Sequence, residues 1–112
     1  MIEVFARRQP ATECGILTGV GKQETVAVRV LISGRVQGVA FRASTQAEAE
    51  GLGVAGWVHN CQDGRVEAVF EGTPNQVAAA VSWCHRGPSW ARVDRVETQP
   101  AAPEGFEGFA IR

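Results

Sequence analysis

Apolar residues recur at every second position in residues 25–33, which is the first regular pattern along the chain. Arg29 and Ser33 fall on the opposite face of this segment. The alternating residues are Val26, Val28, Val30 and Ile32. β-branched residues that alternate in this way are typical of a strand with one buried face. The pattern therefore predicts a strand over residues 25–33.

Further segments carry the same strand-forming composition. Residues 65–71 place Val66, Ala68 and Phe70 on one face, and Asp63-Gly64 just before them is a common hairpin turn. The predicted strands after the first one are residues 54–60, 65–71 and 91–98, with residues 106–111 as a candidate short fifth strand.

Two segments have the pattern of helices. Residues 42–51 carry alanines among polar residues, and glycines mark their end. A second helix begins at Pro74, because Thr73 and Gln76 have the Thr-x-x-Gln spacing of a capping box. Its apolar stripe consists of Val77, Ala80, Val81 and Cys84.

The order of the elements is β-α-β-β-α-β, which predicts an α+β sandwich of the ferredoxin-like kind. We expect an antiparallel sheet of four to five strands with two helices on one face. Residues 25–112 form this one domain. Residues 1–24 carry no sustained periodicity, so we expect them to be a flexible N-terminal extension.

Composition narrows the class of protein. The chain has 112 residues and a net charge of −1, which does not favour a nucleic acid as partner. No apolar run is long enough for a membrane span or a secretory signal. The three cysteines have no metal-ligand spacing, and we expect free thiols in a cytoplasmic monomer. The three tryptophans, Trp57, Trp83 and Trp90, are expected in the core or at its edge.

The segment GRVQGVAFR, residues 34–42, lies between the first strand and the first helix. Gly34 and Gly38 allow backbone angles that turn successive amides toward one point, where an anion can bind. The helix that follows directs its positive end to the same place, and Arg42 can hold two phosphate oxygens. These features predict a phosphate site, and the alternative is a tight strand-to-helix connection with a surface arginine.

This loop resembles the signature of the acylphosphatase family, a GxVQGVxFR segment after a strand. A second segment, Gly56-Trp57-Val58-His59-Asn60 with Gly64, Val66 and Gly72, is similar to the second pattern of that family. Gly87-Pro88 and Ala91-Arg92-Val93 fit its later region. The resemblance covers about residues 26–112.

The resemblance implies the hydrolysis of acyl phosphates to a carboxylate and inorganic phosphate, without a metal or another cofactor. By position, Arg42 matches the arginine that binds the phosphoryl group, and Asn60 matches the asparagine that orients the attacking water. The amides that match the phosphate-binding loop belong to Arg35, Val36, Gln37, Gly38, Val39 and Ala40. A non-catalytic anion-binding module on the same fold is the main alternative, and a nucleic-acid binder is a weaker one.

The histidines and cysteines near Asn60 and in the second helix also carry candidate chemistry. Alternation places His59 on the opposite face from Asn60, so we expect it to face solvent, although a general base is the alternative. Cys61 has no evident base partner and is expected to be a target for oxidation or alkylation and not a nucleophile. Cys84 is expected in the core and His85 at the surface.

Overall fold

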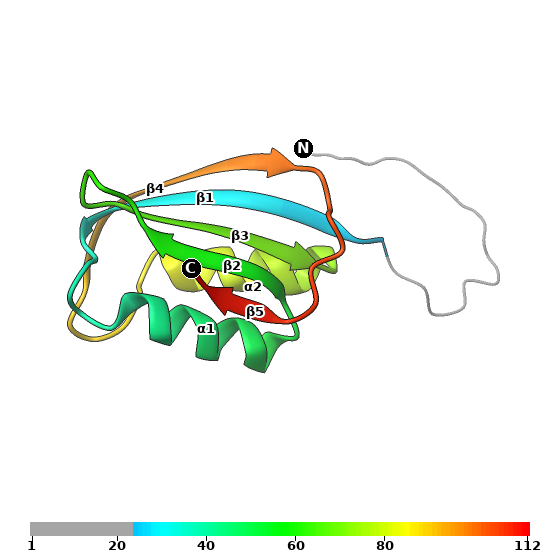
Figure 1. Cartoon of the computed structure of the whole chain (residues 1–112), viewed down its shortest axis with the longest axis horizontal. Helices are drawn as coiled ribbons and strands as arrows, with labels where there is room; N and C mark the ends of the chain where they lie inside the picture. The colour runs from blue at the N-terminus through cyan, green and yellow to red at the C-terminus, as the bar shows by residue number, and fades with distance from the viewer. Residues whose placement is uncertain (1–23) are drawn as a thin grey trace, which may run out of the picture.

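The computed structural model describes residues 24–112, in which two helices cover one face of a five-stranded sheet (Figure 1). The predicted extension, residues 1–24, lies outside these residues except for Glu24. The elements in chain order are β1 (Val26–Arg35), α1 (Phe41–Leu52), β2 (Ala55–Asn60), β3 (Val66–Gly72), α2 (Pro74–Cys84), β4 (Arg92–Ala101) and β5 (Phe109–Ile111).

The strand order in the sheet is β4-β1-β3-β2-β5. β1 pairs antiparallel with β3 and β4, and β2 pairs antiparallel with β3, which confirms the predicted ferredoxin-like arrangement. The fifth strand is present, but it pairs parallel with β2 and makes the sheet mixed. After β4 the chain runs along the end of the sheet to its other edge, as Figure 1 shows, so β5 enters beside β2 in the same direction.

β1 continues past its predicted end at Ser33. The register with β4 shifts between Ser33 and Gly34, and Gly34 then pairs with Val93. Gly34 has φ 130°, and a Cβ atom there would lie 2.2 Å from the carbonyl oxygen of Arg92. Only glycine permits this close approach of β4. The bulge therefore fixes the point at which the chain leaves the sheet and enters the glycine loop.

The core lies between the two helices and the sheet. Phe41 from the start of α1 packs against Trp83 of α2, with ring centroids 5.5 Å apart. Cys84 is buried there as predicted, and burial raises the pKa of its thiol to about 12. The predicted capping box of α2 is confirmed, because the Thr73 hydroxyl accepts from the Gln76 amide at 3.2 Å. Neither helix in the described part of the chain is long and apolar enough to cross a bilayer.

The tryptophans do not share one environment. Trp83 is buried as predicted, and Trp57 is half-buried on the sheet face away from the helices. The prediction is wrong for Trp90, whose exposed fraction is 82%. Trp90 lies in the turn between α2 and β4, where the chain has already left the helix that would direct an apolar side chain inward.

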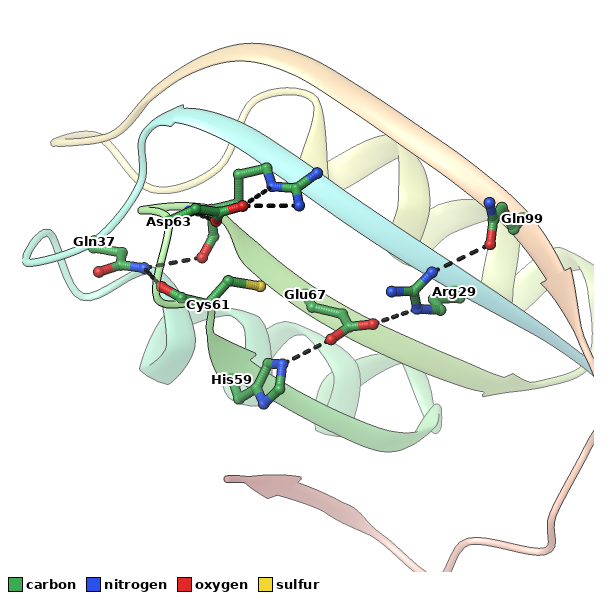
Figure 2. A network of polar contacts seen from close by, with 8 residues as sticks. Arg29, Gln37, His59, Cys61, Asp63, Glu67 and Gln99 are labelled. Carbon is green, nitrogen blue, oxygen red and sulfur yellow. Dashed lines mark hydrogen bonds and ion pairs between the residues drawn. The ribbon is translucent and has the colours of Figure 1, made fainter.

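The sheet face opposite the helices carries a polar network (Figure 2). Glu67 of β3 accepts from the Arg29 guanidinium on one side and bonds His59 Nε2 on the other, at 2.7 Å. Arg29 Nη1 also donates to Gln99 Oε1 at 3.2 Å. His59 is therefore on the predicted face but is engaged with Glu67, and its side chain is only 36% exposed. The histidine predicted to face solvent is thus partly exposed and also bonded to Glu67.

Candidate active site

A cavity of about 200 Å³ opens at the end of the sheet where β1 leads into α1. It brings together Arg42, in the first turn of α1, and Asn60, the last residue of β2. Both side chains were predicted as site residues, and they come from separate motifs. The lining consists of Val36, Gly38, Ala40, Phe41, Arg42, Ala43, Asn60 and Ile111.

The amino end of α1 has no side-chain cap. Its N-cap residue is Ala40, which lies in the left-handed region at φ 62°, ψ 25°, and Gly38 has φ 76°. The first backbone bond of the helix runs from the Ser44 amide to the Ala40 carbonyl, at 3.0 Å. The amides before Ser44 belong to residues that line the cavity, and helix geometry leaves such amides without partners inside the helix.

The electrostatics of this end of α1 favour an anion. The first turn holds no acidic residue, and the helix dipole adds positive potential there. Arg42 is half-buried, and no carboxylate within residues 24–112 forms an ion pair with it. A left-handed alanine costs about 1 kcal/mol, and such strain is found at ligand sites where the fold holds it in place. The arrangement can therefore bind a small anion such as phosphate.

The side chain of Gln37 has a role that the sequence did not reveal. Its Nε2 donates to the Cys61 carbonyl at 2.7 Å and to the Arg65 carbonyl at 2.9 Å, so it ties the loop to the β2–β3 hairpin (Figure 2). Because Cys61 follows Asn60 directly, this contact fixes the end of β2 relative to the loop. Only the backbone amide of Gln37 was predicted to matter.

We expect Gln37→Ala to lower the free energy of unfolding by about 1–2 kcal/mol, because two hydrogen bonds between the loop and the hairpin are lost together. Chemical denaturation of the variant beside wild type measures this difference. Gln62→Ala, which removes an exposed amide from the same hairpin, is the control and should unfold like wild type. Equal stability of the two variants would show that the Gln37 contacts carry no net energy.

The other predicted loop residues line either the cavity or a neighbouring pocket. Val36, Gly38 and Ala40 line the cavity with Arg42 and Asn60. Arg35 and Val39 line the neighbouring pocket together with Trp90. Gly38 and Ala40 line both the pocket and the cavity. Ile111 was missed as a lining residue. It reaches the cavity because β5 pairs with β2 so that Ile111 is opposite Val58, a long-range contact that local periodicity does not encode.

Cys61 lies beside Asn60 but its thiol is not activated. Burial raises the pKa of the thiol, and the nearby carboxylates of Glu67 and Asp63 raise it further. Less thiolate is therefore present than in a free cysteine, which weakens the expectation of oxidation or alkylation. Burial also raises the pKa of Glu67, but hydrogen bonds from Arg29 and His59 lower it overall, so this carboxylate is ionised near neutral pH.

One mixed group of metal-type donors occurs within residues 24–112. Nε2 or Nδ1 of His59, Sγ of Cys61 and a carboxylate oxygen of Glu67 lie within 4.8 Å of one another. All three are half-buried, and they lie on the sheet face opposite Asn60. This group is separate from the cavity and contributes no side chain to its lining.

Comparisons with known proteins agree with the fold and the loop. The family model described as acylphosphatase matches residues 28–111. An acylphosphatase of Rubrobacter xylanophilus is 56% identical over 91 residues, which cover 80% of this chain and 83% of that protein. One from Thermococcus kodakarensis is 55% identical over 86 residues, covering 77% and 94%. The structure of an acylphosphatase from Coxiella burnetii superposes with a TM-score of 0.77 at 34% identity, covering 86% of this chain and all of that one.

Proposed function

The chain belongs to the acylphosphatase family of hydrolases, and from this premise we propose how its own residues act on an acyl phosphate. The phosphoryl group occupies the cavity, where Arg42 and the amides of residues 35–40 bind it. Asn60 orients the water that attacks phosphorus. The observation that supports this most is that an uncapped helix end, an arginine without a carboxylate partner in residues 24–112 and an asparagine line one small cavity.

The hydrogen-bond donors of the cavity are suited to bind a phosphoryl group. The group spreads negative charge over its outer oxygens as the reaction proceeds. Amides held by the fold, together with the fork of a guanidinium, stabilise that charge without reorganising. Arg42 in the first turn of α1 works against the helix dipole, and an anion between them removes this conflict.

The bond that breaks joins phosphorus to a carboxylate oxygen. A carboxylate is a stable anion near neutral pH, so it leaves without a strong general acid. Water is the nucleophile and needs placement more than activation, and a carboxamide can donate to one neighbour and accept from another. Asn60 takes this task, since it lines the same small cavity as Arg42.

The substrate class, the cellular location and the oligomeric state are proposed together with this mechanism. A small-molecule acyl phosphate is the substrate, and the enzyme acts as a cytoplasmic monomer whose catalysis needs neither a metal nor a nucleic-acid partner. Free thiols at Cys61 and Cys84 agree with a reducing compartment. The location and the oligomeric state do not enter the chemistry at the cavity.

Hydrolysis of benzoyl phosphate by the purified chain tests the proposal. We expect turnover in the presence of EDTA, because the proposed chemistry uses only the cavity residues. Release of inorganic phosphate is measured against the uncatalysed rate. A folded chain that binds phosphate but releases none from benzoyl phosphate would instead be an anion-binding module.

A further inference from the structure

We propose that His59, Cys61 and Glu67 form a binding site for a divalent transition-metal ion, and that Zn²⁺ is the ion the site suits best. The site lies on the sheet face away from the helices and is independent of the proposed catalytic cavity. Its three donors are an imidazole nitrogen, a thiol sulfur and a carboxylate oxygen within 4.8 Å of one another. Zn²⁺ is bound in proteins by this set of nitrogen, sulfur and oxygen ligands.

The backbone places the donors close together. His59 and Glu67 are register partners on neighbouring antiparallel strands, so their side chains stand side by side. Cys61 follows two residues after His59, just past the end of β2, and its Sγ lies within 4.8 Å of the other two donors. Figure 2 shows the three side chains gathered at this end of the β2–β3 hairpin. The hairpin also pairs the Cys61 amide with the Arg65 carbonyl at 2.7 Å, which holds the cysteine in position.

The donor atoms lie near enough to one another to form a tetrahedral site after small side-chain movements. Ligand atoms around Zn²⁺ at its usual bond lengths lie roughly 3.3–3.6 Å apart. His59 Nε2 and Glu67 Oε1 are 2.7 Å apart, so their hydrogen bond opens slightly as the ion enters between them. The His59 side chain is 36% exposed and can make this small movement, while Glu67, at 14%, stays in place. Three protein ligands leave a fourth position for water.

Glu67 is already oriented by groups that remain outside the site. Its second oxygen, Oε2, accepts from Arg29, and Arg29 in turn donates to Gln99. Partners of this kind fix a ligand and typically affect metal affinity by about 10–100-fold. On binding, the Cys61 thiol gives its proton to solvent and binds as thiolate, and His59 binds as neutral imidazole. The two anionic ligands balance the charge of the ion.

Titration of the EDTA-treated and dialysed full chain with Co²⁺ tests the site. We expect one Co²⁺ per chain, with a near-ultraviolet band from sulfur-to-cobalt charge transfer that Zn²⁺ abolishes by displacement. Cys61→Ser should lose the band, and Glu67→Gln should bind Co²⁺ at least about tenfold more weakly. Far-ultraviolet circular dichroism confirms that each variant is folded.

A cysteine elsewhere in the chain, Cys14, provides the matched control. Cys14→Ser removes a different thiol and should keep the band and the affinity of wild type. An unchanged band in Cys61→Ser, or its loss in Cys14→Ser, would overturn the assignment of the ligands. No band and no bound Co²⁺ in wild type, with benzoyl phosphate turnover intact, would overturn the metal site and leave the proposed activity standing.

Discussion

Arg42→Ala is expected to lower kcat/KM for benzoyl phosphate by roughly 10²–10³-fold, the loss seen when one donor to a developing anion is removed. Arg42 lies at the uncapped end of α1 and lines the cavity with Asn60. Its removal takes away both a charge and a pair of parallel N–H donors. Inorganic phosphate should therefore inhibit the variant much more weakly than wild type. Steady-state kinetics with phosphate as the inhibitor measure both effects.

Two further variants separate the shape of Arg42 from its charge. Arg42→Lys keeps the charge but loses the planar fork, and we expect it to remain well below wild type. Arg86→Ala removes an exposed arginine just after α2 and should behave like wild type. Full activity in Arg42→Lys would mean that a point charge suffices, and full activity in Arg42→Ala would remove Arg42 from the mechanism.

Asn60→Ala is expected to lower kcat by about 10²-fold or more while the inhibition constant of phosphate stays near that of wild type. The reason is that the proposed role of Asn60 is to place water, whereas the loop amides and Arg42 bind the anion. Turnover rates and phosphate inhibition are measured on the same preparation. Gln62→Ala, an exposed amide two residues further on, is the control.

The two readouts for Asn60 can contradict the assignment in different ways. Normal turnover in Asn60→Ala would show that Asn60 does not place the attacking water and is only the residue at the end of β2. A parallel loss of phosphate affinity would make it a binding residue. Asn60→Asp provides a further check, since a carboxylate facing the phosphoryl group should weaken both phosphate inhibition and turnover.

Local patterns predicted the elements that are built from local interactions. Alternating β-branched residues predicted β1, and the Thr73–Gln76 pair predicted the start of α2. Each of these patterns depends only on residues that are close in sequence. The glycines of the loop likewise predicted the connection between β1 and the first helix, although that helix begins at Phe41 and not at Arg42. The resemblance to acylphosphatases added Asn60, whose position before a turn would otherwise suggest a bond to its own backbone.

Features that depend on distant pairing were not predictable in this way. Ile111 reaches the cavity only through the parallel pairing of β5 with β2, and Gln37 reaches Cys61 only because the loop and the hairpin meet at one end of the sheet. Trp90 was placed in or near the core by composition alone, yet its turn carries it into solvent. Each of these depends on where whole strands lie and not on the residues next in sequence.

The uncapped amino end of α1 also links the stability of the enzyme to the chemistry that it is proposed to perform. An anion that completes this helix end binds the folded chain and has no such site on the unfolded one. Phosphate at one hundred times its dissociation constant would then add about 2.7 kcal/mol to the free energy of unfolding. The released product would thus compete with substrate and protect the fold at once, so the enzyme would be slowest and most resistant to heat where its product accumulates.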